Sequence, residues 1–321
     1  MFAASVLLTA ACADDASGSG TTIDSGTSGD ETGAAEPSTP VDSQVTGTED
    51  DGASTSGESE DSASTQDPPG DSAPSEGCGR PIRDSGTIEL DIDAGGASRQ
   101  VFVMIPPGYD PDHPYPIVYN WHGLGGDAQQ STTWLGVPHA SGGEAILVYP
   151  QGEGGSYDPA NQWDLAYPDV ATYMGENYCV DENRVYSISY SGGGALNVYL
   201  ACIYDDFAAG VKVSNLNGWP SDEELIAGGN PPCFHNPFMF IYDENDGNFD
   251  WQGAADEILL YAGCSGEGGE ASVFGSNSCL HYTDCTDGPA RVCVYDNPGD
   301  PHAWLNEHQD AIWDFLAPIS K

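Results

Sequence analysis

Ser191 stands in a run of residues that is typical of a catalytic nucleophile. The run Ser-Ile-Ser-Tyr-Ser-Gly-Gly-Gly at 187–194 joins a β-branched stretch, 184–188, to a helix-like stretch, 195–200. A serine at such a sharp strand-to-helix turn exposes its hydroxyl, and the N–H groups at the helix start favour developing negative charge. Ser189 occupies the position of the first glycine in the usual G-x-S-x-G pattern, where a Cβ atom crowds the turn. A glycine-rich loop without chemistry is the alternative interpretation.

Asp246 and His302 are the predicted partners of Ser191, and each follows a later strand-like run. A serine hydroxyl needs an imidazole to take its proton, and the imidazole needs a buried carboxylate that fixes its tautomer. A serine nucleophile with this base and acid performs acyl transfer and needs neither a metal nor an organic cofactor, so we expect neither. The alternatives are Asp243 and Asp250 for the acid, and His281, in a cysteine-rich insertion, and His308, on the surface of a predicted helix, for the base.

The run Trp-His-Gly-Leu-Gly-Gly at 121–126 is expected to complete the site. The loop after the third strand and the residue after the nucleophile supply backbone N–H groups to an oxyanion, which indicates Leu124 and Gly192, with Gly123 as the alternative to Leu124. His122 is expected to bond to the loop backbone. Four aromatic side chains are predicted to contact substrate, with a place in the core as the alternative interpretation: Trp121, Trp163, Tyr190 and Trp304.

The strand-like and helix-like runs around these residues predict one α/β domain. Eight strands are predicted, at 87–92, 99–105, 116–121, 145–149, 184–189, 211–215, 238–242 and 291–295, with helices at 193–203, 251–262 and 303–316. This pattern indicates a mostly parallel eight-stranded sheet with helices on both faces. Catalytic and ligand-binding residues usually lie at the carboxyl ends of such strands. The chain order Ser, Asp, His after the fifth, seventh and eighth strands is that of the α/β-hydrolase fold.

The N-terminal 77 residues differ in kind from the rest of the chain. Residues 1–12 form a short apolar segment that ends in Leu-Thr-Ala-Ala-Cys, which predicts a lipoprotein-type signal with Cys12 as the lipidated residue. An ordinary signal-peptide cleavage site is the alternative. Residues 13–77 are rich in Ser, Thr, Gly, Asp and Glu, contain no aromatic residue, and are predicted to be a disordered linker. The catalytic domain is then expected at 78–321, outside the cell or on its surface, with membrane contact only through Cys12.

Eight cysteines remain besides Cys12, and an even number in an exported chain indicates up to four disulfides. The formal net charge of −44 excludes nucleic acid and anionic membrane surfaces as partners. Residues 78–321 hold 35 of the 51 acidic residues and all 7 basic ones, so the predicted domain itself is strongly acidic. A salty environment and an ordinary acidic secreted protein both account for this charge. We expect a monomer.

Several motifs in the predicted domain occur together in a known group of enzymes. They include Ile-Pro-Pro-Gly-Tyr at 105–109, Tyr-Pro-Gln-Gly at 149–152, Tyr-Cys-Val-Asp at 178–181 and His-x-Trp at 302–304, besides the runs at 121–126 and 190–193. The set resembles the secreted esterases grouped with polyhydroxybutyrate depolymerases, feruloyl esterases and acetylxylan esterases. In place of that group's His-Gly-Thr-x-Asp, residues 242–246 read Tyr-Asp-Glu-Asn-Asp, which leaves Asp243 beside Asp246 as a candidate acid.

The resemblance implies a serine esterase that hydrolyses a carboxylic ester, in polysaccharide esters or in a polymeric polyester, through Ser191, Asp246 and His302. A serine peptidase or acyltransferase would use the same three residues. A non-catalytic surface-binding lipoprotein is the third interpretation, suggested by the altered runs at 189–193 and 242–246.

Overall fold

The computed structural model describes residues 72–81, 85–157, 161–214, 236–247, 250–265, 268–286 and 288–321. The chain divides into two units, 1–63 and 64–321, and all described residues belong to the second. The predicted signal with Cys12, linker residues 13–71, Cys233 and the strand end at Asn215 lie outside the described residues.

The folded unit begins before the expected boundary at Cys78. The N–H of Ala73 donates to the Asp181 carboxylate at 2.9 Å, and the N–H of Ser75 donates to the carbonyl of Val180 at 2.9 Å. A disulfide between Cys78 and Cys179 fastens the same segment. Residues 72–77 are therefore part of the folded unit.

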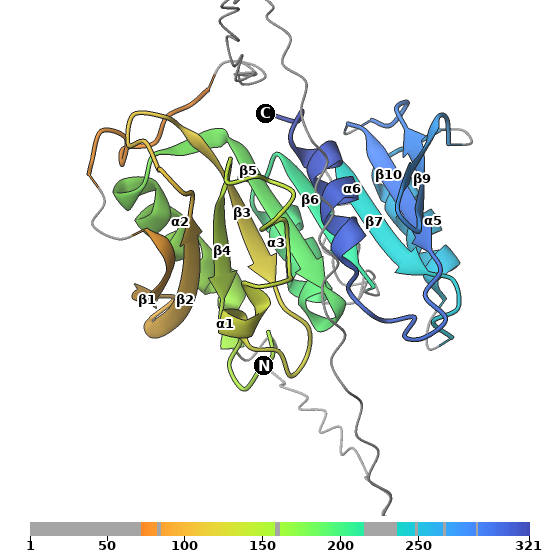
Figure 1. Ribbon diagram of the computed structural model, residues 1–321, viewed down its shortest axis with the longest axis horizontal. Coiled ribbons are helices and arrows are strands. Elements are labelled where there is room, and N and C mark those ends of the chain that lie inside the picture. Colours follow the sequence, from red (N-terminus) through yellow and green to blue (C-terminus); the bar gives the residue numbers. More distant parts are fainter. Residues whose placement is uncertain are drawn as a thin grey trace, which may run out of the picture. The chain divides into compact units, whose positions relative to one another are not determined.

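The strands of the described part form one ten-stranded sheet in the order β1-β2-β4-β3-β5-β6-β7-β10-β9-β8 (Figure 1). Their bounds are β1 Gly86–Ala94, β2 Ala97–Ile105, β3 Tyr115–Trp121, β4 Ile146–Pro150, β5 Val180–Tyr190, β6 Ala209–Val213, β7 Phe238–Asp243, β8 Ala271–Phe274, β9 Asn277–Tyr282 and β10 Ala290–Tyr295. The pairs from β4 to β10 are parallel, while β1, β2, β9 and β8 join by antiparallel pairs. The carboxyl ends of β3, β5, β7 and β10 therefore meet at one edge.

The central strands are buried on both faces because helices cover both sides of the sheet. Every residue of β3, β4, β6 and β7 is buried, as expected for parallel strands with near-continuous apolar sequences. The β1–β2 hairpin turns at Gly95 and Gly96, whose φ angles of 58° and 78° suit a two-residue turn that glycine favours.

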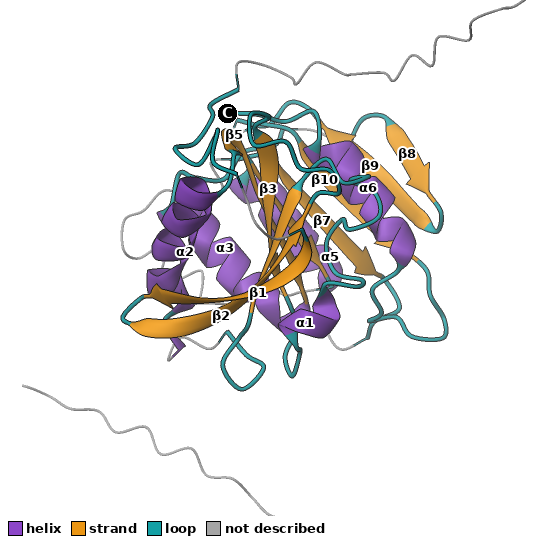
Figure 2. Ribbon diagram, turned by 60° about the vertical axis from the view of Figure 1, so that its left-hand side comes forward, coloured by secondary structure: helices purple, strands orange, loops and turns teal. Residues whose placement is uncertain are grey.

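Five helices are named in the described part: α1 Ala128–Ser131, α2 Trp163–Asn177, α3 Gly194–Ile203, α5 Trp251–Tyr261 and α6 Asn306–Leu316. Side chains of α2 and α3 pack into one core with one face of the sheet, whereas α1 and α6 pack into a second core on the opposite face (Figure 2). A third cluster joins α5 to β7. No helix among the described residues is long and apolar enough to span a membrane.

The expected α/β-hydrolase class is confirmed, but the predicted eight strands are too few. The strands β8 and β9 were not predicted; they form a hairpin in the cysteine-rich insertion and extend the sheet beyond β10. Burial alternates along both strands, but residue type does not follow it, because Asn277 is buried while Val273 and Leu280 are exposed. Two of the three disulfides between described cysteines hold this region, Cys264–Cys285 and Cys279–Cys293, and Cys202 is also disulfide-bonded.

Candidate active site

Ser191 lies at the turn between β5 and α3 with a strained backbone. Its φ is +48°, in the left-handed region that a residue with a Cβ rarely adopts. The glycines that follow allow the turn to approach β3 closely, because a Cβ on Gly193 would lie 2.5 Å from the carbonyl oxygen of Trp121. This geometry is that of a nucleophile at a strand-to-helix elbow.

The serine at the first position of the elbow is accommodated by hydrogen bonds. Ser189 is fully buried, and its hydroxyl donates to the carbonyl of Val211 at 3.2 Å while it accepts from the Asn197 side chain at 2.9 Å. Asn197 comes from α3, so the helix behind the nucleophile supplies the partner. The departure from glycine therefore leaves no polar group of Ser189 unpaired.

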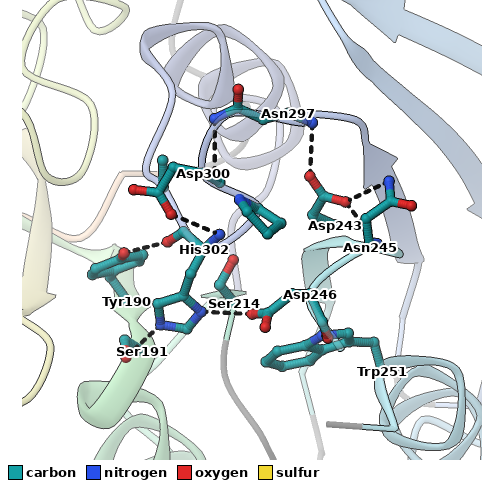
Figure 3. A network of polar contacts seen from close by, with 12 residues as sticks. Tyr190, Ser191, Ser214, Asp243, Asn245, Asp246, Trp251, Asn297, Asp300 and His302 are labelled. Carbon is teal, nitrogen blue, oxygen red and sulfur yellow. Dashed lines mark hydrogen bonds and ion pairs between the residues drawn. The ribbon is translucent and has the colours of Figure 1, made fainter. Parts of the chain in front are cut away.

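His302 connects Ser191 to Asp246 in one line of hydrogen bonds (Figure 3). Its Nδ1 lies 2.7 Å from Asp246 Oδ2, and its Nε2 lies 2.9 Å from Ser191 Oγ. Because a carboxylate accepts, the proton is assigned to Nδ1, which leaves the Nε2 lone pair for the serine hydroxyl. The Asp246 side chain is 1% exposed and that of His302 is 34% exposed, so the acid is enclosed and the base reaches the surface.

The backbone around His302 and Asp246 is held by aromatic side chains. The Tyr190 hydroxyl donates to the carbonyl of His302, and burial raises the pKa of Tyr190 to about 12, which keeps this donor protonated. The Tyr295 hydroxyl lies 3.0 Å from the carbonyl oxygens of residues 301 and 303, on either side of the histidine. The indole N–H of Trp251 donates to the carbonyl of Asp246 at 2.6 Å.

Asp243, the alternative acid, points away from the imidazole. Its carboxylate accepts from the N–H groups of Asn245 at 2.8 Å and Asn297 at 2.7 Å (Figure 3). The structure therefore brings Asp246, and not Asp243, to His302. His281 bonds to Ser272 within the β8–β9 hairpin, and His308 is fully buried, so the expected surface position of His308 is wrong.

The predicted oxyanion donors lie side by side next to the serine. A Cβ on Gly192 would stand 3.0 Å from the backbone nitrogen of Leu124, and a Cβ on Gly123 would stand 3.1 Å from the Cβ of Ser191. His122 locks this loop: its Nδ1 donates to the carbonyl of Gly123 at 2.8 Å, and its Nε2 accepts from the N–H of Gly152 at 3.1 Å. Burial lowers the pKa of His122, which favours this neutral tautomer.

Two of the four aromatic residues predicted to contact substrate belong to the core. Trp121 and Trp163 are 0% and 1% exposed and pack in the cluster that joins the sheet to α2, so they offer substrate no surface. Trp121 is buried because β3 is covered on both faces, and Trp163, at the start of α2, packs against it with 6.1 Å between the ring centroids. Tyr190 and Trp304 are half-buried beside His302.

A third aromatic residue, Trp134, joins Tyr190 and Trp304. The ring centroids are 5.5 Å apart for Trp134 and Tyr190, 5.9 Å for Trp134 and Trp304, and 6.0 Å for Tyr190 and Trp304. We call these three residues the aromatic cluster. Trp134 was not predicted, because its segment between α1 and β4 does not directly follow a catalytic strand and shows no helical or strand periodicity.

Curated proteins with similar sequences include feruloyl esterases. The chain is 26% identical over 246 residues to feruloyl esterase D of Neurospora crassa, which covers 70% of this chain and 81% of that protein. It is 28% identical over 265 residues to feruloyl esterase C of Emericella nidulans, which covers 76% of this chain and 91% of that protein. No protein-family model matches the chain.

Solved structures share the fold at low sequence identity. A thermostable esterase superposes with a TM-score of 0.53 and 14% identity, over 73% of this chain and 63% of that one. A feruloyl esterase module from Clostridium thermocellum, solved with sinapinate, gives a TM-score of 0.51 and 16% identity, over 76% of this chain and 94% of that one.

Proposed function

We propose that this chain, an esterase of the α/β-hydrolase group, cleaves its ester through an acyl-enzyme formed on Ser191. The observation that carries the proposal is the continuous line from Ser191 Oγ through His302 to Asp246, at 2.9 and 2.7 Å. A serine, a histidine and a buried aspartate in that order perform nucleophilic acyl transfer on several unrelated folds.

In the first step, His302 Nε2 takes the Ser191 proton as Oγ attacks the ester carbonyl carbon. The negative charge of the tetrahedral intermediate lies against the N–H groups of Leu124 and Gly192, whose backbones adjoin in front of the serine. Asp246 stabilises the imidazolium. The imidazolium then protonates the leaving alcohol, and the acyl group stays on Ser191.

In the second step, water replaces the alcohol. His302 removes a proton from the water, hydroxide attacks the acyl carbon, and the serine oxygen leaves with the proton that the histidine holds. Both steps use the same donors, so no other group of the protein has to change its charge.

We further propose esters of aromatic acids on polysaccharides as the substrate class. Tyr190 joins the aromatic cluster to His302, with 5.5 Å between the ring centroids of Tyr190 and His302. The three rings meet edge to face and each is partly exposed, and a planar acyl ring can pack against such aromatic side chains. The similarity to feruloyl esterases supports the same class.

Hydrolysis of methyl ferulate, acetylxylan and a hydroxybutyrate oligomer by the full chain tests this proposal. We expect hydrolysis of methyl ferulate and covalent labelling by a fluorophosphonate, and we expect Ser191→Ala to abolish both. Ser272→Ala is the control, because the Ser272 hydroxyl also bonds to a histidine, His281 at 2.7 Å, but lies in the β8–β9 hairpin outside the candidate site. A wild-type chain that resists labelling would refute the mechanism, and a preference for acetyl or hydroxybutyrate esters would refute the substrate class.

We also propose that the enzyme is exported and that Cys12 carries a lipid, as its signal-like segment predicts. The three disulfides between described cysteines support an oxidising location outside the cytoplasm. A polymeric substrate suits an enzyme that acts at the cell surface or beyond it.

A further inference from the structure

Asp243 is the first residue of the loop that carries the proposed acid, and its carboxylate faces the loop that carries the proposed base. We call residues 243–246 the acid loop and residues 296–302 the histidine loop. We propose that Asp243 is a positioning residue, whose carboxylate fixes the separation of these loops and thereby the alignment of Asp246 with His302. This inference rests on the proposed function, because alignment matters only if His302 acts as the base.

The carboxylate bonds to both loops at once. Its Oδ1 accepts from the backbone N–H of Asn245 at 2.8 Å and from the Asn245 side chain at 3.1 Å, within the acid loop. Its Oδ2 accepts from the backbone N–H of Asn297 at 2.7 Å, in the histidine loop. The Asn245 side chain makes a second link across the loops, by donating to Asp296 at 3.2 Å.

Further hydrogen bonds link Asp243 to the proposed acid, Asp246, and the proposed base, His302 (Figure 3). In the histidine loop, the Asn297 side chain donates to the carbonyl of Asp300 at 2.8 Å, and Asp300 Oδ1 accepts from the N–H of His302 at 3.2 Å. In the acid loop, the N–H of Asp246 donates to the carbonyl of Asp243 at 3.2 Å. Asp246 and His302 are thus tied to Asp243 from opposite sides.

The position requires a carboxylate and not merely a polar side chain. Asp243 is 1% exposed, and no ion pair of the described residues includes it, so backbone and amide N–H groups balance its charge. Both oxygens accept from backbone N–H groups of different loops. An asparagine has one acceptor oxygen, so in either orientation its NH₂ group would face a donor and one loop would be released.

Asp243→Asn tests the inference in the full chain with an ester that the wild type hydrolyses. A shift of about 1 Å in a catalytic group can cost about 10²-fold in rate. We therefore expect kcat to fall about 10- to 100-fold, KM to stay within about twofold, and the low-field NMR signal of the His302 Nδ1 proton to move or broaden. Glu244→Gln is the matched control, since it removes the same charge from an exposed neighbour and should leave kcat unchanged.

A comparison with Asp246→Asn separates this inference from the proposed function. We expect Asp246→Asn to lower kcat by about 10³- to 10⁴-fold. In the Asp246→Asn background, Asp243→Asn should lower kcat by less than a further factor of about three. The alignment of Asp246 with His302, which Asp243 maintains, is already lost in that background. Wild-type kcat in Asp243→Asn would refute the positioning role alone. Near-complete loss in Asp243→Asn with activity retained in Asp246→Asn would instead refute the proposed acid.

A second variant carries the test if Asp243→Asn does not fold. Asp243→Ser puts a small neutral hydroxyl in place of the carboxylate, so no buried charge is lost to an amide and no single oxygen reaches both loops. We expect kcat to fall about 10- to 100-fold in the folded variant, and an unchanged kcat would overturn the proposal.

Discussion

For single residues, the main requirement of the site is that the loop after β3 can approach Ser191 closely. The left-handed backbone of this residue holds its hydroxyl clear of the sheet, while Gly192 and Gly193 let the loop after β3 come within contact distance. Any side chain at these positions would push the loop that carries Leu124 away from the serine. Glycine is therefore needed at these positions because it has no side chain, which lets the loop with Leu124 approach Ser191.

Gly192→Ala should impair the proposed oxyanion site without unfolding the protein. The new Cβ would stand 3.0 Å from the nitrogen of Leu124 and 3.2 Å from its Cβ, so one of the two N–H groups must move. Loss of one oxyanion donor costs about 10²- to 10³-fold in kcat in other hydrolases, and we expect a fall of about 10²-fold here by steady-state kinetics. Gly175→Ala on α2, where the nearest atom would be 3.7 Å away, should keep wild-type kcat. Equal kcat in the two variants would contradict this assignment.

At the scale of elements, the β8–β9 hairpin docks on the helix that follows the histidine loop. The disulfide Cys279–Cys293 joins β9 to β10 at paired positions, and the Glu307 carboxylate of α6 accepts from the N–H of Ser276 at 2.7 Å. The fully buried His308 lies at the centre of this junction, with its Nδ1 2.8 Å from Asn277 Oδ1. The β8–β9 hairpin thus supports α6, the helix that follows the histidine loop.

His308 should make the stability of this junction depend on pH. Burial lowers its pKa from about 6.5 to about 4, so the folded state keeps it neutral while the unfolded chain binds a proton. Its contribution is therefore fully present above about pH 6.5 and is lost as the pH falls toward 4, by about 3 kcal/mol. Denaturant unfolding at several pH values should show His308→Asn to be less stable than wild type at pH 8, with a difference that shrinks toward pH 4. The exposed His139→Asn is the control, and a difference that stays constant with pH would rule out this role.

For the molecule as a whole, the net charge of −44 opposes electrostatic binding to an anionic membrane. Anionic lipid headgroups repel such a chain at low ionic strength, and the attraction that basic segments give to membrane-associated proteins is missing. The proposed lipid on Cys12 would provide an attachment that does not depend on charge. Acidic residues are spread over both the N-terminal segment and residues 78–321, so the repulsion concerns the whole chain.

Cys12→Ser should release the protein from membranes. Expressed in a bacterial host that processes lipoproteins, the wild type should partition into the detergent phase and the variant into the aqueous phase, with equal esterase activity in both. Ser17→Ala, a small change close to the same position, should behave as wild type. A wild type found in the aqueous phase would show that Cys12 is not lipidated.

Local patterns identified most of the fold and the residues that meet at its edge. Strand-like runs predicted eight of the ten strands, and since parallel strands end at a common edge, the order of Ser191, Asp246 and His302 along the chain was enough to expect them together. The β8–β9 hairpin was not predicted because its residue types do not follow its burial, with Asn277 buried and Leu280 exposed, and because its pairing depends on β10 and a disulfide.

Local patterns along the chain were sufficient to predict the fold class and the candidate chemistry, because strand period, glycine-rich turns and residue order are local properties. Which of two aspartates faces the imidazole depends on the folded loops, because Asp243 and Asp246 are three residues apart and differ only in where the loop turns. It also moved Trp121 and Trp163 into the core, buried His308 and placed Trp134 in the aromatic cluster. These outcomes depend on contacts between segments far apart in the chain, which no local pattern records.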